Sequence, residues 1–253
     1  MTLCVAWIRS GRTDLMSDSR LSFGSGIYID VGLKVFEVRS SIKDARTGNT
    51  RESILGLAFA GSAIHAMLVK DKLNSLLRHI TVNPISGEDS MDAVSEMVEN
   101  FLRGIGERFV ASGLPTESVL FLAGFCPLQG ITRVFEIEYN QSSGTRRQER
   151  AGDGCYAIGS GRASFDLEWQ SKRHRNPYRA LREVIDKQLD PGVGGAIQCG
   201  HFEGSNFMLK GIVMSDDNKH LPGVFVAGEQ VYGNTLFGSS YIPTGQFLAP
   251  FKD

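Results

Sequence analysis

Short apolar runs alternate with polar segments through the first 61 residues. Four of these runs are rich in β-branched and aromatic residues and predict strands: 2–9, 15–21, 34–40 and 54–61. We expect the polar segment between the last two runs, 40–53, to form an unusually long hairpin loop. The first strand is unusual because it begins directly after Met1, where most chains carry disposable polar residues.

The spacing of apolar residues becomes helical after residue 61. Apolar side chains recur every three or four positions from Ser62 to Ile80 and again from Ser90 to Phe109, which predicts two helices. Ser90 is the expected N-cap of the second helix. We expect the Met and Phe side chains of these stripes to pack in the core rather than to hold a cofactor.

The second half of the chain returns to strands around one further helix. Asn176 can cap a helix and Pro177 suits its first position, so we predict a helix over 176–190. The arginine-containing segment 140–154 is interpreted as a solvated loop. Further strands are predicted at 118–125, 132–139, 155–161, 195–202 and 207–214.

This order of elements predicts an α+β fold, because a doubly wound sheet would alternate single helices with single strands. Two antiparallel sheets packed face to face, with helices on both outer faces, would form a four-layer αββα sandwich and explain the nearly continuous apolar strands. No linker or internal repeat divides the chain. We expect one domain over 1–220, with 221–253 as its irregular, Gly- and Pro-rich extension.

Composition excludes several classes of function. The formal net charge of -1 gives no general attraction to nucleic acid or to a membrane surface. The chain has neither an apolar run of membrane-spanning length nor the basic start of a signal peptide, so we expect a cytoplasmic protein. The Cys and His residues are scattered without ligand spacing, and no nucleotide-binding Walker motif is present. We therefore expect no disulfide, metal or other cofactor.

Thr2 is the first candidate for chemistry. Removal of Met1 is favoured when the second residue is small, and it would leave Thr2 with a free α-amine beside its own hydroxyl. An α-amine has a pKa of ~8, so part of it is neutral at pH 7 and can accept the hydroxyl proton. One residue would then supply both nucleophile and base. Thr2 alone is weak support, since many inert proteins begin with Met-Thr.

Such a nucleophile needs a nearby cation, a carboxylate that holds the cation, and N–H groups that bind an oxyanion. The segment SDSR supplies Asp18 and Arg20, and Lys34 begins an apolar run. Taken singly, Lys34 is best explained as a solvated strand end. Asp18 and Arg20 are best explained as a turn with a surface ion pair of little energetic value.

Together, the order and spacing of Thr2, SDSR, KVF and FAGSA resemble the proteasome β-type N-terminal-threonine peptidases, which include the HslV-like and Anbu-like proteins. The resemblance continues in GSG (159–161) and DPGVGG (190–195) and spans about residues 2–215. It implies the N-terminal nucleophile (Ntn) hydrolase fold, which is the four-layer sandwich described above.

The resemblance also implies roles for individual residues. Thr2 would be the nucleophile, with Lys34 lowering the pKa of its hydroxyl and Asp18 holding Lys34. The Gly61 N–H would bind the oxyanion. The remaining implied residues orient the amine or support the site: Ser160, Asp190 and, behind them, Arg20. Val193 stands where the family has a serine, so one hydroxyl near the amine is missing.

The family's substrate pocket would lie beside the Lys34 strand and the segment after Gly61. In this chain that location implies an apolar lining formed by Leu21, Gly32, Phe59, Ala63 and Met67. An apolar lining favours apolar substrate side chains, although each of these residues would also suit an ordinary core.

The predicted function is a threonine-type endopeptidase subunit in a self-compartmentalising ring or stacked rings of identical subunits, acting on peptides or unfolded protein. Any ATP-dependent unfoldase would be a separate partner. One alternative is a catalytically silent assembly subunit, against which the full set of implied catalytic residues argues. Another is an amidase that uses the same chemistry on small amides.

Overall fold

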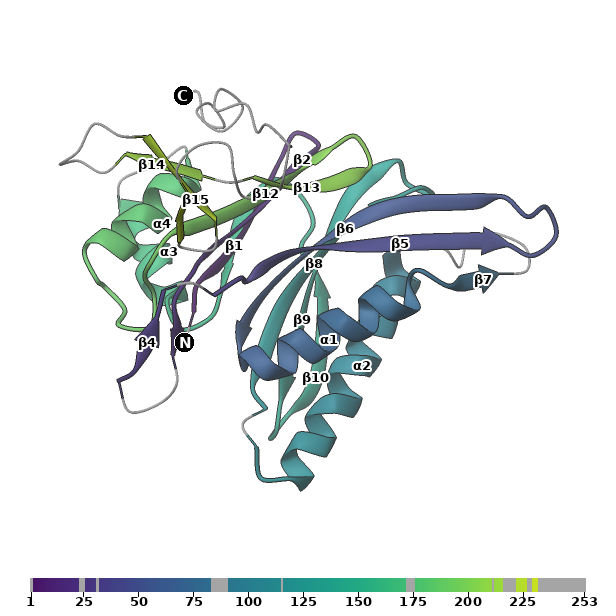
Figure 1. Ribbon diagram of the computed structural model, residues 1–253, viewed down its shortest axis with the longest axis horizontal. Helices are drawn as coiled ribbons and strands as arrows, with labels where there is room; N and C mark the ends of the chain where they lie inside the picture. Colours follow the sequence, from purple (N-terminus) through teal and green to yellow (C-terminus); the bar gives the residue numbers. More distant parts are fainter. Residues whose placement is uncertain are drawn as a thin grey trace.

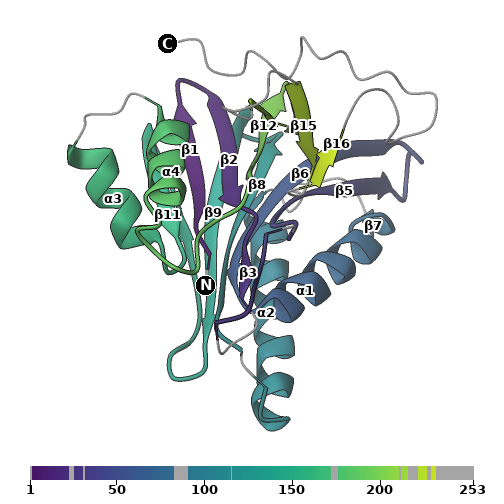
Figure 2. The ribbon, with the colours of Figure 1, turned by 60° about the vertical axis from the view of Figure 1, so that its left-hand side comes forward.

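The computed structural model describes residues 2–22, 26–30, 32–82, 91–114, 116–171, 176–210, 212–215, 222–226 and 229–231. Within these residues the chain forms two large sheets, two small ones and four helices. Figures 1 and 2 show the two large sheets side by side, with a pair of helices on each outer side.

The first large sheet has five strands, each antiparallel to its neighbours. From edge to edge they are β11 (Gly154–Ile158), β1 (Cys4–Arg9), β2 (Arg12–Asp18), β12 (Ile197–Glu203) and β13 (Asn206–Lys210). The strand that follows Thr2 is therefore an inner strand, paired on both sides. This pairing fixes the start of the chain.

The second large sheet has six strands, antiparallel except where β7 meets β5. In order they are β10 (Gly144–Glu149), β9 (Ile131–Asn140), β8 (Ser118–Cys126), β6 (Thr50–Gly61), β5 (Val35–Asp44) and β7 (Ile80–Val82). The small sheets pair β3 (Leu21–Ser22) with β4 (Tyr28–Ile29), and β14 (Ile212–Ser215) with β15 (Pro222–Val226) and β16 (Glu229–Val231).

The helices pack in two pairs on opposite sides (Figure 1). α1 (Ala63–Leu76) and α2 (Met91–Ala111) bury Val69, Leu73, Val98 and Leu102 against the second sheet. α3 (Arg162–Ser171) and α4 (Pro177–Asp186) cover the first sheet, with Phe165 and Leu181 buried. A third apolar cluster takes residues from both sheets: Cys4, Leu15, Ala58, Phe121 and Phe207 are among them.

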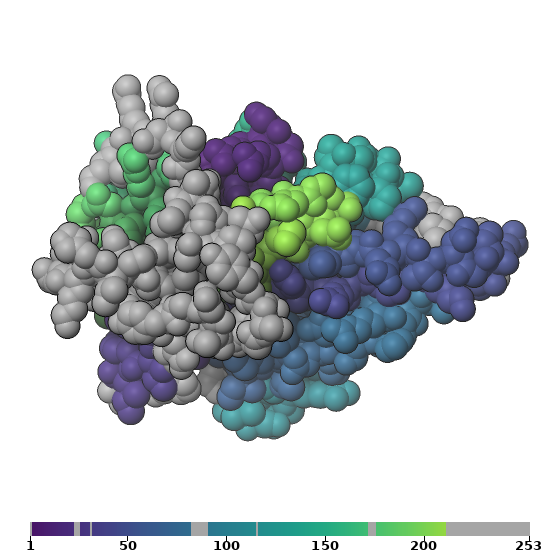
Figure 3. Space-filling model, turned by 45° about the horizontal axis from the view of Figure 1, so that its top comes forward, coloured from purple at the N-terminus to yellow at the C-terminus, as the bar shows by residue number. Residues whose placement is uncertain are grey.

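The edge strand β13 of the first sheet also contacts strands β5 and β6 of the second sheet. On the face shown in Figure 3, β13 lies between the β1–β2 turn and the β5–β6 hairpin. Asn206 Oδ1 accepts from the Ile54 amide at 3.1 Å, and the Leu209 amide donates to Glu37 Oε1 at 2.9 Å. These bonds tie the edge of one sheet to the face of the other.

The structure corrects several predictions. Segment 40–53 is not a loop: β5 and β6 continue through most of it to a short turn, where Asp44 Oδ1 accepts from the amides of Arg46 and Thr47. Figure 1 shows this hairpin extending beyond the body. The expected loop 140–154 contains β10, which is held by pairing to β9. Ile80 belongs to β7, because α1 ends at Leu76.

A helix was also missed after β11. The residues of α3 carry a weak apolar stripe in which only Phe165 is buried, so the apolar pattern contains little signal for this helix. The helix predicted after Asn176 is confirmed as α4, with the Asn176 side chain accepting from the Tyr178 amide at 3.0 Å and Pro177 in the first turn. Ser90, Met1 and most of the expected 221–253 extension lie outside the described residues.

Among the described residues, none of the helices is both long enough and apolar enough to cross a membrane.

Candidate active site

Thr2 is 2% exposed and lies just before β1, where the first sheet approaches the end of β6. Its nitrogen donates to Ser160 Oγ at 3.2 Å, and its carbonyl accepts from the Gly161 amide at 3.4 Å. Gly159 has a φ of +97°, and a Cβ there would lie 2.1 Å from the Thr2 carbonyl oxygen. The turn before α3 therefore contacts both the nitrogen and the carbonyl of Thr2.

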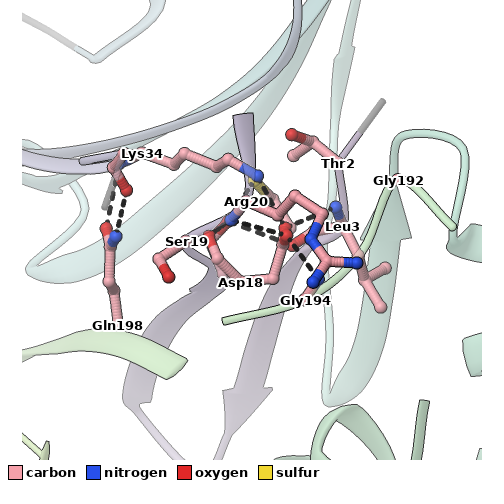
Figure 4. A network of polar contacts seen from close by, with 12 residues as sticks. Thr2, Leu3, Asp18, Ser19, Arg20, Lys34, Gly192, Gly194 and Gln198 are labelled. Atoms are coloured by element: carbon pink, nitrogen blue, oxygen red, sulfur yellow. Dashed lines mark hydrogen bonds and ion pairs between the residues drawn. The ribbon is translucent and has the colours of Figure 1, made fainter. Parts of the chain in front are cut away.

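Asp18, at the end of β2, is fully buried and is the centre of the polar network in Figure 4. Its Oδ1 accepts from the Leu3 amide at 2.9 Å and from Lys34 Nζ at 2.8 Å. Its Oδ2 accepts from the amides of Gly194 at 3.0 Å and Arg20 at 3.1 Å. All four partners are donors, so both oxygens of the buried carboxylate have hydrogen-bond partners that stabilise its negative charge.

Lys34 is a fully buried lysine, and both it and Asp18 have no exposed side-chain surface. A buried ion pair is costly unless further hydrogen bonds satisfy it, and here three backbone amides do so for Asp18. Because Asp18 Oδ1 bonds both to Lys34 and to the amide after Thr2, the ammonium is held next to the predicted nucleophile. The interpretation of Lys34 as a solvated strand end is wrong.

Ser160 links the Thr2 nitrogen to Asp190. Ser160 Oγ lies 3.4 Å from Asp190 Oδ1, which also accepts from the Gly192 amide at 2.7 Å. Val193, which stands where the resemblance implied a serine, is fully buried and packs beside Gly161, where a Cβ would lie 2.6 Å from its Cγ2. The missing hydroxyl is thus replaced by apolar packing.

Gly61 ends β6 at the surface with a φ of +101°. A Cβ there would lie 2.4 Å from the Glu117 carbonyl oxygen, so only glycine fits. The preceding residue, Ala60, approaches Gly159, whose Cβ would lie 3.0 Å from that of Ala60. Gly159 also contacts Thr2. Gly61 therefore directly follows a residue, Ala60, that packs on the glycine next to the predicted nucleophile.

Arg20 is placed differently from a simple surface ion pair. Its guanidinium forms a bidentate pair with Asp30, at 2.7 and 2.9 Å, and donates to the Pro191 carbonyl at 3.2 Å. Hydrogen bonding to Arg20 lowers the pKa of Asp30. The guanidinium packs directly against Gly194: a Cβ at position 194 would lie 2.3 Å from Arg20 Cζ. Arg20 thus joins the β4 segment to the loop that carries Asp190.

Of the expected substrate-lining residues, Phe59 lies in the core, whereas Ala63 and Met67 are partly exposed. Leu21 packs directly on Gly32, where a Cβ would lie 2.3 Å from Leu21 Cγ, while Ala63 is half-buried and Met67 is 40% exposed. Phe59 is only 1% exposed and belongs to the core beneath α1 and α2. Its ring therefore lies in the core rather than on an open lining.

Gln198 was missed by the sequence reasoning. It is 8% exposed on β12, and its side chain hydrogen-bonds to the Gly32 carbonyl and to the Lys34 amide. Figure 4 shows Gln198 beside the main chain of Lys34. A signal was present, because Gln198 is a polar residue inside the apolar run 195–202.

A buried histidine supports the segment opposite Gly61. His65 is fully buried in α1, with Nδ1 2.9 Å from Ser118 Oγ and Nε2 3.0 Å from the Leu102 carbonyl oxygen. Ser118 is paired with Gly61 across β6 and β8. Nδ1 also lies 3.0 Å from the Thr116 carbonyl oxygen. A neutral ring protonated on Nε2 donates to the Leu102 carbonyl and accepts the Ser118 hydroxyl proton on Nδ1, but it gives no proton to the Thr116 carbonyl.

Burial lowers the pKa of His65 below 6.5, so stability should depend on pH through this residue. Below pH ~6.5 the unfolded chain takes up a proton that the folded chain resists, so stability is complete above that pH and falls below it. Denaturant unfolding at pH 7.5 and pH 5.5 should show a smaller loss of unfolding free energy in His65→Gln than in the wild type. Equal losses in the two proteins would contradict the assignment.

In the part of the chain that the structure describes, no three His, Cys, Asp or Glu side chains are grouped as a metal site.

No protein-family model and no curated protein matches the chain. Solved structures do match over most of its length. Anbu (ancestral beta-subunit) from Yersinia bercovieri is 16% identical with a TM-score of 0.61, over 85% of this chain and 88% of the other. The helical assembly of the Anbu complex from Pseudomonas aeruginosa is 14% identical with a TM-score of 0.60, over the same 85% and 88%.

A third match is Thiobacillus denitrificans BPH in complex with epoxomicin. It is 17% identical with a TM-score of 0.52, over 80% of this chain and 99% of the other. At these identities the likeness concerns the fold. The chain therefore has the fold shared by Anbu and other proteasome-like Ntn proteins, as the spacing of its motifs predicted.

Proposed function

We propose that this chain is a threonine-type Ntn endopeptidase subunit whose sheets and helices form the four-layer αββα sandwich of that fold. The observation that carries the proposal is the set of contacts around Thr2. The Thr2 nitrogen donates a hydrogen bond to Ser160 Oγ. The next amide, that of Leu3, donates to Asp18, which forms a buried ion pair with Lys34. An inert subunit would not require a buried charge at this position.

The chemistry begins once hydrolysis removes Met1. The α-amine of Thr2 takes the proton from its own hydroxyl, and the oxygen attacks the carbonyl carbon of the substrate. The Lys34 ammonium stabilises negative charge on that oxygen, and the Gly61 N–H donates to the oxyanion. The proton passes to the leaving amine as the C–N bond breaks, which leaves an ester on Thr2. A water gives a proton to the Thr2 amine and attacks the ester carbon. The bond between that carbon and the Thr2 oxygen then breaks, the acyl group leaves as a carboxylic acid, and the amine returns the proton to the Thr2 oxygen.

Ser160 and Asp190 act on the amine. Ser160 Oγ accepts from the Thr2 nitrogen, and Asp190 in turn accepts from Ser160. These two hydrogen bonds orient the lone pair of the neutral amine toward the hydroxyl. Val193 offers no hydroxyl, so proton handling at the amine depends on this single path.

We also infer self-assembly of the chain. One similar structure is described as a helical assembly of an Anbu complex, and assembly would restrict access to Thr2. The ring, the peptide or unfolded-protein substrate and any separate unfoldase are parts of the same proposal. A silent assembly subunit and a small-amide amidase are the alternatives that the next experiment and substrate comparison address.

The test is the mature N-terminus and its reactivity. Intact mass should show loss of Met1, and epoxomicin, the compound bound by the similar BPH structure, should add one molecule to the N-terminal peptide. The same protein with an extra residue retained before Thr2 should form no adduct. A retained Met1, or no adduct on a processed chain, would contradict the peptidase proposal and favour the silent subunit.

A further inference from the structure

The segment from Gly32 to Val35 enters the site without full backbone pairing of its own. Lys34 is outside β5, which begins at Val35. Its carbonyl accepts from the Phe59 amide at 3.2 Å, and the Gly32 amide donates to the Ser19 carbonyl at 2.8 Å. The Lys34 amide and the Gly32 carbonyl face the first sheet, where burial obliges them to find partners.

Gln198 supplies those partners from the other sheet. Alternation along β12 places Ile197 and Cys199 in the helix-facing core, so Gln198 points between the sheets, on the same side as Phe202. Its Oε1 accepts from the Lys34 amide at 2.9 Å and from the Val35 amide at 3.3 Å. Its Nε2 donates to the Gly32 carbonyl.

An uncharged amide can serve all of these groups at once. The Lys34 and Val35 amides require an acceptor, and the Gly32 carbonyl requires a donor, within one side chain. An apolar side chain of the same length would leave these buried groups without partners. The cost of an unsatisfied buried group exceeds the net value of the bond that it loses.

We propose that Gln198 is a positioning residue that sets the place of the Lys34 ammonium relative to Thr2. By holding the Lys34 main chain, Gln198 fixes the base of a side chain whose far end meets Asp18 at 2.8 Å. By holding Gly32, it also fixes the surface on which Leu21 packs. The proposal rests on the proposed function for its catalytic consequence, but not for the tether itself.

The first arm of the test measures the tether without activity. Hydrogen exchange of a peptide that covers residues 33–36 should be at least about tenfold faster in Gln198→Met than in the wild type, because the amides of Lys34 and Val35 both lose their shared acceptor, Gln198 Oε1. Gln148→Met, on the edge strand β10, should leave this peptide unchanged. Unchanged exchange in Gln198→Met would overturn the proposal, whatever the protein's activity.

The second arm measures the effect on the reaction with epoxomicin. Gln198→Met should lower the maximal rate of adduct formation about tenfold while the concentration for half-maximal rate changes less than twofold. A role in folding alone would lower the melting temperature and leave the rate of the folded protein unchanged, which would overturn the positioning role. If Gln198→Met does not fold, Gln198→Asn, which keeps both polar atoms on a shorter arm, gives the same comparison.

The two arms separate the two proposals. A wild type that forms no adduct defeats the proposed function, and the exchange data still decide whether Gln198 tethers the segment. A reactive wild type with no rate change in a folded Gln198 variant defeats the positioning role alone.

Discussion

Replacing Thr2 by alanine should abolish acyl transfer and leave the fold intact. Thr2→Ala removes the attacking oxygen, while the nitrogen that binds Ser160 and the carbonyl that faces Gly161 remain. Loss of a nucleophile lowers kcat by at least about 10³-fold. Hydrolysis of a fluorogenic peptide with an apolar residue before the cleaved bond, together with epoxomicin labelling, measures the effect.

Two variants sharpen this comparison. Thr2→Ser keeps a hydroxyl and a removable Met1, so it should retain measurable turnover and labelling. Thr13→Ala removes a buried threonine hydroxyl from the far end of β2 and should leave kcat unchanged. Full turnover by Thr2→Ala would show that the reaction takes place elsewhere. Comparison of peptides with small amides on the wild type then distinguishes an endopeptidase from an amidase.

Asp18→Asn should be among the most damaging single changes in the protein. Each carboxylate oxygen of Asp18 accepts from two donors. The NH₂ group of an asparagine would therefore face two donors in either orientation of its side-chain amide. The Lys34 ammonium would at the same time lose its buried counter-ion. Breaking a buried pair in this way costs about 3–5 kcal/mol, and we expect both a large loss of unfolding free energy and loss of activity.

Asp186→Asn is the matched control for that prediction. Asp186 pairs with Arg182 at 2.9 Å on α4, with 54% of its side chain exposed, and such surface pairs contribute at most about 1 kcal/mol. Urea unfolding of the two variants measures the difference. Equal, small losses in both would show that Asp18 and Lys34 are not the buried, mutually dependent pair described above.

The elements with strong local patterns were predictable. The apolar strands around Cys4, Ala58 and Phe121, the apolar stripe of α2 and the Asn176–Pro177 start of α4 lie where the pattern placed them. Their side chains repeat with the period of their own element, and a period is visible in a single sequence. The missed α3 has only one buried side chain, so its pattern carried little information.

The polar segments needed the tertiary structure. Residues 40–53 and 144–149 look like loops because their side chains are polar, yet β5, β6 and β10 pair through their main chains. Backbone pairing does not require apolar side chains, so composition alone could not reveal it. The same holds for Gln198, whose partners Gly32 and Lys34 lie more than 160 residues away.

For the site, the sequence by itself determined which residues have the chemistry: a threonine after Met1, an acidic and a basic residue at fixed intervals, and a glycine at the end of a strand. Only the tertiary structure decided that Lys34 is buried rather than solvated, and that Asp18 bonds both to it and to the amide beside Thr2. The reason is physical. The charge of a side chain is written in the sequence, but its burial and its partners arise only when the two sheets close on each other.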